Sequence, residues 1–454
     1  LNGRYDGTSR FMKDQRWNFF PSFSLGWNVA RENFWKPLES VVNQFKLRGS
    51  WGELGNQNTS NLYPFYEILP VKSNSGNWLV NGGKTNTADI PSLVSTLLTW
   101  ERVRSFNVGF DFGAFSNRLT GSFDYFVRKT VDMVGPAPQL PLVLGIAPAI
   151  VNNADMKSYG FEIELSWRDR IGEVDYGVKF NLADAQQKVV KYPNTTNAFN
   201  DWYAGKMSGE IWGYTSLGIA KTDEEMKEHL ASLPNGGQNQ LGNKWGAGDI
   251  MYADINGDGK VDGGKGTLAD PGDQRIIGNS TPRYNFGLVL DASYKGFDVS
   301  IFFQGVGKRD YAPIVGTNGA VFWGAVNNIW QSMAMEEHFD YFRPEGHPMG
   351  ANLNGYYPRP DFTSNKNHQV QTRYLQDASY IRLKNLQIGY TLPKQWINKL
   401  HINRCRVYVS GDNLWTGTSL ASMFDPETLA AGDWGSGKTY PLSKVISFGL
   451  NVNF

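Results

Sequence analysis

One stretch of the sequence has the spacing of oxygen ligands around a hard cation. It runs Asp254-Ile255-Asn256-Gly257-Asp258-Gly259-Lys260-Val261-Asp262. Carboxylate or amide groups occupy positions 1, 3, 5 and 9 of a calcium loop, a glycine permits the sharp turn, and the Lys260 carbonyl is available at position 7. Position 12, which usually carries a chelating Glu, is Lys265. The stretch predicts a structural Ca²⁺ site without its usual closing acid, and a set of Asx turns without an ion is the alternative.

Aromatic side chains in the long segment 309–375 form a second group of candidates. Flat rings offer apolar contact to sugar faces, peptide side chains or a partner protein. The candidate contacts to substrate or partner are Trp323, Trp330, Tyr341, Tyr356 and Tyr357. Packing within the loop, or a belt of rings at a membrane interface, is the alternative for the same residues.

The sequence offers little for catalysis. Its five histidines are scattered, and it contains no His-Glu-x-x-His motif, no Gly-x-Ser-x-Gly motif and no phosphate loop. The single cysteine, Cys405, excludes a disulfide framework and thiolate metal clusters. A net charge of +1 argues against a nucleic-acid partner held by a broad basic field. We therefore expect a protein that is not an enzyme, with calcium as its one cofactor.

The elements that must position these groups are β-strands. At the C-terminus, Ile446, Phe448, Leu450, Val452 and Phe454 alternate with small or polar residues, so one strand face is apolar. The same alternation recurs at 23–29, 106–112, 119–127, 161–167, 176–182, 286–303, 386–392 and 405–409. Aromatic residues make up 14% of the chain, yet no apolar run approaches the roughly 18 residues of a membrane helix. This combination favours a membrane β-barrel.

Connections between these segments alternate between short and long. Short turns lie near 116–117, 168–173 and 295–296, and long connections lie near 55–97, 131–155, 189–282, 309–375 and 415–441. Outer-membrane barrels have short periplasmic turns and long extracellular loops. The pattern predicts an all-β, transmembrane antiparallel barrel of about 12 strands. Phe454, at the end of the last strand, is predicted to lie in the periplasm and to act as a signal for barrel assembly.

Several ordered motifs carry a family resemblance. They are Arg16–Val29, Phe45–Gly55, Trp100–Met133, Gly248–Gly259, Gly296–Gly305, Asp377–Pro393, Arg406–Asn413, Asp425-Pro426-Glu427 and the final strand. Together they resemble the C-terminal half of a SusC/RagA-type TonB-dependent transporter of a Bacteroidetes outer membrane. The resemblance covers nearly all of residues 1–454 and implies a barrel of about 22 strands. It implies that this chain supplies about 12 C-terminal strands and lacks the N-terminal plug, so that either this chain is a fragment or the rest lies on another chain. A self-closed barrel is the alternative.

The resemblance also implies a function. Such proteins import a bulky nutrient, an oligosaccharide or a peptide, across the outer membrane with energy from a TonB complex. The implied partners are a SusD-like surface lipoprotein, the TonB complex through the missing N-terminal part, and outer-membrane lipid. An adhesin or a secretion-linked barrel without an import role is the alternative, and a plug with a TonB-contacting segment would distinguish the two. The sequence does not identify the substrate.

The same resemblance adds one residue to the calcium prediction. Similar proteins place an acid before an Arg-x-Ile-Ile-Gly-like run. Here that acid is Asp273, which precedes Gln274-Arg275-Ile276-Ile277-Gly278 after an insertion around 263–271. The resemblance implies that Asp273 completes the shell of the ion, with Asp270 as the alternative. The ion would stiffen an extracellular loop near the lipoprotein lid.

Overall fold

The computed structural model of the chain describes most of its residues. They are 1–59, 62–91, 93–135, 143, 145–146, 148–313, 320–324, 335–362, 364–398, 401–429 and 439–454. Trp330, one of the candidate contact residues, lies outside this set. The helices of the described part are short, and none of them is both long enough and apolar enough to cross a membrane.

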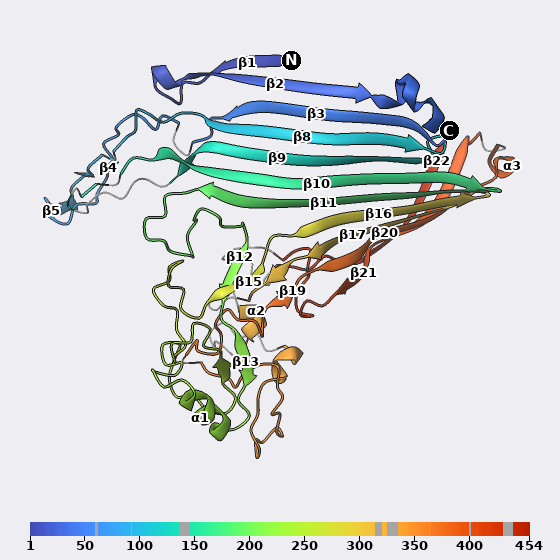
Figure 1. The fold of residues 1–454 in the computed structure, drawn as a ribbon. Coiled ribbons are helices and arrows are strands. Elements are labelled where there is room, and N and C mark those ends of the chain that lie inside the picture. Colours follow the sequence, from blue (N-terminus) through green and yellow to red (C-terminus); the bar gives the residue numbers. More distant parts are fainter. Residues whose placement is uncertain are drawn as a thin grey trace. The chain divides into compact units, whose positions relative to one another are not determined.

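Twelve strands form one antiparallel sheet whose order follows the chain (Figure 1). They are β1 (Asn2–Gly7), β2 (Trp17–Asn28), β3 (Val42–Asn56), β8 (Glu101–Ala114), β9 (Leu119–Gly135), β10 (Val151–Ile171), β11 (Val174–Lys191), β16 (Arg283–Tyr294), β17 (Phe297–Lys308), β20 (Tyr380–Thr391), β21 (Arg404–Thr418) and β22 (Val445–Asn453). The prediction of an all-β fold with an up-and-down sheet of about a dozen strands is confirmed.

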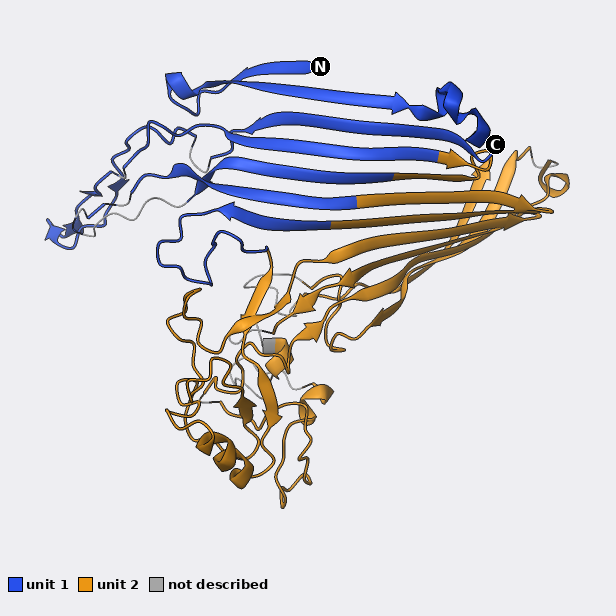
Figure 2. Ribbon diagram, viewed as in Figure 1, with its two compact units in different colours: residues 1–112, 123–161, 185–207 blue, residues 113–122, 162–184, 208–454 orange. Residues whose placement is uncertain are grey.

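The chain forms two compact units, coloured separately in Figure 2. Unit 1 comprises residues 1–112, 123–161 and 185–207, and unit 2 comprises 113–122, 162–184 and 208–454. Unit 1 holds most of the first half of the sheet. Unit 2 holds the last five strands and the loops that connect them.

In unit 2 the register of the strands separates an apolar face from a polar face. Apolar pairs are Val299–Ile388, Ile388–Val409, Val409–Phe448 and Val407–Leu450, and polar or small pairs are Ser300–Gln387, Gln387–Ser410, Arg406–Asn451 and Tyr408–Gly449. Because side chains alternate along a strand, each pair continues the face of its neighbours. Phe448 and Leu450 are 85% and 64% exposed. An exposed apolar face is typical of a sheet that borders lipid.

Unit 1 shows the same separation through ring contacts. Phe110 of β8 lies 5.7 Å from Phe45 of β3 and 5.6 Å from Phe123 of β9, measured between ring centroids. Phe123 in turn lies 6.4 Å from Phe161 of β10. The four rings mark one face of β3, β8, β9 and β10. On the opposite face, a Cβ on Gly109 would meet the carboxylate of Asp124.

Tight turns join the strands at one end of the sheet. Lys295 and Gly296 connect β16 to β17, with φ of 47° and 92°, and the flanking residues Tyr294 and Phe297 pair across the hairpin. Two central residues with positive φ form a type I′ turn, whose twist matches that of the strands. Two other turns at this end carry short helices, η2 (Val29–Arg31) with η3 (Asn33–Leu38), and α3 (Lys394–Ile397).

At the other end of the sheet the connections are long and contain their own structure. In unit 2 they hold the ribbons β12 (Glu210–Gly213) with β15 (Arg275–Asn279), β13 (Ser216–Ile219) with β14 (Ile250–Tyr252), and β18 (Asp310–Tyr311) with β19 (Gln376–Asp377), together with the helices α1 (Asp223–Ala231), α2 (Ala320–Trp323) and η6 (Glu336–Phe339). In unit 1, β4 (Val71–Lys72) pairs with β7 (Thr87–Ala88), and β5 (Leu79–Val80) with β6 (Gly83–Lys84). Thr222 caps helix α1, because its hydroxyl accepts a hydrogen bond from the Glu225 amide.

These loops of unit 2 share one buried cluster, which we call the loop core. Its residues are Tyr214, Leu233, Ile250, Tyr252, Val261, Val321, Phe322, Trp323, Tyr357, Tyr374, Ala378, Leu420, Phe424 and Leu429. They come from all three long connections that follow β11. The loop core therefore gives these connections an interior of their own, as in a small soluble domain.

Candidate functional site

The predicted calcium stretch folds as a series of tight turns between β14 and β15. The carboxylate of Asp254 accepts hydrogen bonds from the amides of Gly257 at 2.6 Å and Gly259 at 2.8 Å. Asn256 Oδ1 accepts from the Asp258 amide, and Asp258 Oδ1 accepts from the Lys260 amide. The oxygens at the first three ligand positions therefore organise the backbone of the loop in this structure.

Asp273 comes to this loop across the insertion. It is fully buried, its Oδ1 accepts from the Ile255 amide at 2.7 Å, and its Oδ2 accepts from the Asp262 amide at 2.8 Å. Burial raises the pKa of the Asp273 carboxyl, and the backbone hydrogen bonds oppose that rise. The structure thus brings together Asp273 and the loop. Through its hydrogen bond with Asp262, Asp273 connects the residue before the insertion to the residues that follow it.

The remaining acid of the set, Asp262, already has a cationic partner. The ammonium group of Lys260 donates to Asp262 Oδ2, and the Gly264 amide donates to Oδ1 at 2.7 Å. The hydrogen bond from Lys260 lowers the pKa of the Asp262 carboxyl. Across the described residues, no three acidic, His or Cys side chains are grouped so that they could share one metal ion. The donor types fit calcium, but this side-chain arrangement would have to change to bind it.

The aromatic candidates occupy different environments. Trp323 and Tyr357 are 0% and 2% exposed and belong to the loop core. Trp323 packs edge-on against Tyr374 at 4.7 Å between ring centroids. Tyr356 and Tyr341 pack against the outside of the loop core and are partly buried. In this structure Trp323 and Tyr357 support the fold of the loops, and Tyr341 and Tyr356 are the candidates that retain accessible surface.

A buried ionic network, which sequence spacing did not predict, stands beside the loop core. The fully buried carboxylate of Asp249 accepts from Arg359 at 2.8 and 2.6 Å, from Lys366 Nζ at 2.9 Å and from Asn367 at 2.9 Å. The Gly246 amide donates to it at 2.9 Å. Lys366 is itself 1% exposed. These partners are more than 100 residues apart from Asp249 in sequence, with Gly246 as the exception, so no local signal marks the network.

His368, next to this network, is a buried imidazole without a hydrogen-bond partner. Neither of its ring nitrogens has a partner within the described structure, and its ring lies 4.6 Å from that of Trp323. Burial lowers the pKa of His368 to about 4, against a smaller opposite effect of the Asp361 charge. The histidine is therefore neutral at physiological pH.

A second ionic cluster ties the last long loop to the sheet. Arg382 of β20 donates to Asp425 and Glu427 at 2.7 Å each, and Lys384 donates to Glu427 at 2.6 Å. Arg382 and Asp425 have side chains that are only 4% and 8% exposed. The two terminal nitrogens of this nearly buried guanidinium bind different carboxylates, and such charge-assisted hydrogen bonds hold the geometry strongly. The Asp425-Pro426-Glu427 motif thus anchors the start of this loop.

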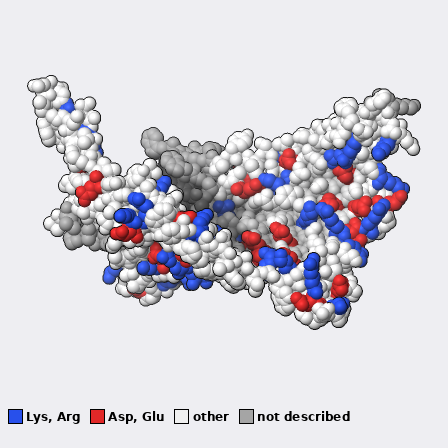
Figure 3. Space-filling view, turned by 90° about the horizontal axis from the view of Figure 1, so that it is seen from above, with Lys and Arg blue, Asp and Glu red and all other residues white. Residues whose placement is uncertain are grey.

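The polar face of the strands forms an ion-paired wall. In unit 1, Arg48 donates to Asp111 and Asp124 at 2.8 Å each, beside an open hollow of about 300 Å³ that Lys46 and Asn107 help to line. In unit 2, Arg406 pairs with Asp298. Acidic and basic side chains are interspersed on the surface seen in Figure 3. The described polar face thus carries both signs of charge, and its Arg48 and Arg406 are paired with acids.

Comparison with known proteins identifies the family of this chain. The family model described as TonB dependent receptor-like, beta-barrel, matches residues 1–414. TonB-dependent receptor P3 of Formosa agariphila is 30% identical, and the match covers 100% of this chain and 44% of that protein. TonB-dependent receptor SusC of Bacteroides thetaiotaomicron is 23% identical, over 99% of this chain and 41% of that protein.

A solved structure shows the same fold. The RagAB peptide transporter matches with a TM-score of 0.73 and 22% identity, over 98% of this chain and 44% of that chain. This chain therefore spans less than half the length of the relatives that it matches. The resemblance to SusC/RagA-type proteins is confirmed. The chain belongs to the TonB-dependent receptors, a family of receptors and transporters rather than enzymes, and its twelve-stranded sheet is part of a β-barrel of the bacterial outer membrane.

Proposed function

We propose that the whole protein imports a bulky nutrient, an oligosaccharide or a peptide, through the outer membrane. The match of 99% of this chain to a SusC receptor is the observation that carries the proposal. The fold of a complex described as a peptide transporter adds to it. TonB supplies the energy, through a part of the protein that lies outside this chain.

The wall and the loops fit that role. The polar face carries ion pairs such as that of Arg406 with Asp298, and polar groups of this kind suit a wall that faces a hydrated solute. The loop core places a rigid body at the extracellular end of the last strands. A SusD-like surface lipoprotein is the proposed partner, and it would close over these loops.

Uptake by living cells tests the proposal. A strain without the gene should fail to accumulate one labelled class, oligosaccharides or peptides, and the full-length gene should restore uptake. A full-length variant without its TonB-contacting segment should reach the membrane and still fail to restore uptake. Uptake that does not depend on TonB would contradict the proposal and favour the alternative, an adhesin or a secretion-linked barrel.

Tyr341 is the proposed contact to substrate or to the lipoprotein. Its ring is partly exposed, Arg343 stacks on it at 5.0 Å, and its hydroxyl donates to the sulfur of Met349. An aromatic ring with an adjacent cation can bind sugars, peptide carboxylates or a partner surface. In the full-length protein, Tyr341→Ala should raise the half-saturating substrate concentration while Tyr341→Phe should not. If both variants have the half-saturating substrate concentration of the wild type, Tyr341 does not contact the substrate.

We also propose that the 254–262 loop binds Ca²⁺ with a structural role. Asp254, Asn256, Asp258, the Lys260 carbonyl and Asp262 would hold the ion, and Asp273 stands close enough to join them. Weak extracellular calcium sites bind at about 10⁻⁴–10⁻³ M. Millimolar calcium should therefore protect this loop from protease, and Asp258→Ala should abolish the protection, whereas Glu345→Ala in another exposed loop should not. If the loop is cleaved by protease equally with and without calcium, the stretch is a set of turns that does not bind the ion.

A further inference from the structure

The apolar face of three neighbouring strands, β8, β9 and β10, ends in a row of cations. On β8 the apolar positions are Phe112, Phe110, Val108 and Phe106, and the next position on that face is Arg104. On β9 they include Phe123, Tyr125 and Val127, followed by Lys129. On β10 they are Trp167, Leu165, Ile163, Phe161 and Tyr159, followed by Lys157. The three strands are neighbours in the sheet, so the cations form a continuous row.

The row lies at the edge of the band that borders lipid. The ring contacts of Phe110, Phe123 and Phe161 place these apolar runs on one face. A transmembrane strand needs about 9–11 residues to cross the hydrocarbon core. From Trp167 to Tyr159 the apolar run of β10 covers that distance, and Lys157 comes next. Lysine at this depth extends its ammonium to the headgroup layer.

The loops show which leaflet the row faces. The end of β9 beyond Lys129 leads into the long connection to β10, and the other end of β9 follows the tight turn after β8. Long loops are extracellular in outer-membrane barrels. The row therefore faces the outer leaflet, whose glycolipids carry phosphate groups.

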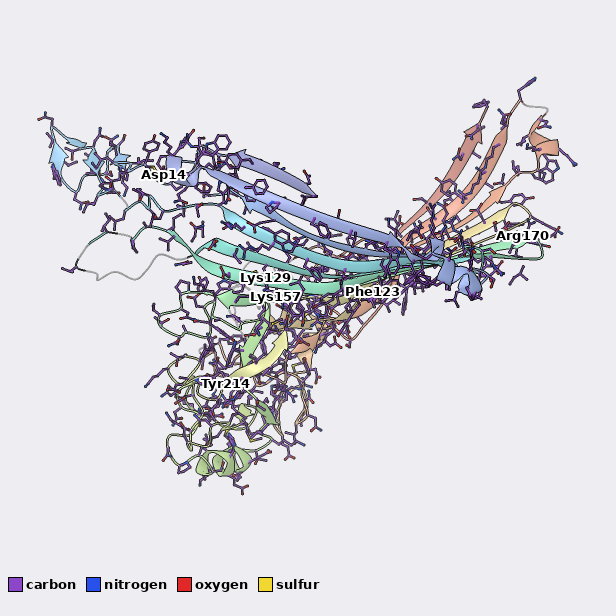
Figure 4. The ribbon with its side chains drawn as sticks, turned by 45° about the horizontal axis from the view of Figure 1, so that its top comes forward. Asp14, Phe123, Lys129, Lys157, Arg170 and Tyr214 are labelled. Atoms are coloured by element: carbon purple, nitrogen blue, oxygen red, sulfur yellow. The ribbon has the colours of Figure 1, made fainter. Side chains whose placement is uncertain are left out.

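The two lysines lack acidic partners. No ion pair or hydrogen bond of Lys129 or Lys157 with an acid occurs in the described part of the chain, and Lys157 lies over the Tyr159 ring at 5.0 Å. Figure 4 shows Lys129 and Lys157 side by side on adjacent strands, nearer the loop end than Phe123. Neighbouring strands are about 4.8 Å apart, so two long ammonium side chains can reach one phosphate.

Nearby acids do not neutralise the row. Glu53 of β3 pairs with Arg104 at 2.8 Å and with Arg102 at 3.3 Å, so one carboxylate serves two guanidinium groups. Asp155 lies two residues beyond Lys157 on the loop side, and its carboxylate accepts from the Asp132 amide. Both aspartates stand further from the apolar band than the lysines.

We propose that Arg104, Lys129 and Lys157 bind a phosphate group of an outer-leaflet glycolipid. The apolar rows below them would contact the acyl chains of the same molecule. Cations near an anionic membrane surface contribute about 1 kcal/mol each, which is about a fivefold change in affinity per residue. The inference requires only the outer-membrane location of the barrel and does not depend on what it imports.

The test measures glycolipid retained by the full-length protein. Wild type and Lys129→Gln/Lys157→Gln are purified in mild detergent and mixed with bisphosphorylated lipid A or with its dephosphorylated form. Bound lipid per protein is counted by native mass spectrometry. Lys46→Gln/Lys179→Gln is the matched control, since it removes the same charge from the opposite, polar face of β3 and β11. Heat-modifiable migration on a gel confirms that each variant is folded.

Binding of the phosphorylated lipid should fall by about tenfold or more in the lysine variant and stay unchanged in the control. The dephosphorylated lipid should bind weakly to all three proteins. Equal binding of the phosphorylated lipid by the lysine variant and wild type would overturn the proposal, and the lysines would then only extend into water. An equal loss in the control would also overturn it, because total charge rather than this row would then hold the lipid.

Discussion

The twelve-stranded sheet, here called the wall, and the loop core cover their apolar side chains in opposite ways. Phe448 and Leu450 on the wall are mostly exposed in the chain itself, so their stabilising environment is the lipid. In the loop core, Trp323 and Tyr252 are fully buried by the protein. Buried polar groups such as Asp249 are paired there by side chains from distant segments. The stability of the wall therefore depends on the surrounding lipid, whereas the stability of the loop core depends on packing within the protein.

This difference separates what each region tolerates. On the wall a substitution matters through the face on which it falls, because register decides whether it meets lipid or the lumen. In the loop core a substitution matters through the partners that it leaves unpaired or the cavity that it creates. Damage to the loop core should leave the barrel inserted, and damage to the wall should prevent insertion.

Removal of Phe454 should give the largest effect, on the wall alone. This residue follows β22 and is 85% exposed. If the terminal aromatic residue is the signal for assembly, its deletion from the full-length protein should remove most of the heat-modifiable, membrane-inserted form. Immunoblots of outer-membrane fractions measure that form. If the deletion variant inserts as well as wild type, Phe454 is not the signal that the assembly machinery recognises.

Loss of Asp249 should be the most destabilising change in the loop core. Asp249→Ala removes the carboxylate that lies 2.9 Å from the ammonium of Lys366, which is 1% exposed, and leaves only Asp361 at 3.8 Å. Breaking a buried pair in this way costs about 3–5 kcal/mol. Limited proteolysis of the purified full-length protein should show cleavage between β11 and β20 with the barrel intact. The double variant Asp249→Ala/Lys366→Met should recover part of the resistance, and no recovery would argue against the unpaired charge as the cause.

Arginine substitutions on β22 test the two faces of the wall. Leu450→Arg should cost about 2–4 kcal/mol if it lies near the bilayer midplane, because it places a cation in hydrocarbon. Asn451→Arg, one residue further, should cost much less because position 451 is opposite Arg406 on the polar face, where the new cation stays in water rather than in hydrocarbon. Unfolding of the full-length protein by denaturant in lipid vesicles measures both. Equal costs would contradict the assignment of faces.

The pH dependence of the loop core should be smaller and should centre on His368. Burial lowers its pKa to about 4 in the folded state, below the ordinary value of 6.5, so folding favours the neutral ring. The stability that this neutral state contributes is complete above pH 6.5 and is lost as the pH falls towards 4, by on the order of 2 kcal/mol at pH 5. Protease sensitivity of the loops should therefore rise between pH 6.5 and 5. His368→Leu should flatten that rise in protease sensitivity. If the pH profile of the variant is unchanged, the rise comes from the titration of other groups.

The sequence by itself determined the wall. Alternation with a period of two depends only on neighbouring residues, and lipid on one face makes it strict, so strands such as β21 and β22 could be predicted from residue types. The turns of the 254–262 loop were equally local, since Asp254 bonds amides three and five residues ahead. Family resemblance, rather than spacing, placed Asp273 beside that loop.

Only the tertiary structure decided the loop core. The sequence marked Trp323 and Tyr357 as aromatic but not as enclosed, because enclosure depends on segments that approach from other loops. The pairing of Asp249 with Lys366 spans 117 residues and has no periodic signature. Charged residues have no local preference that reveals such a partner. Burial of either charge is unfavourable until the fold brings the two residues together.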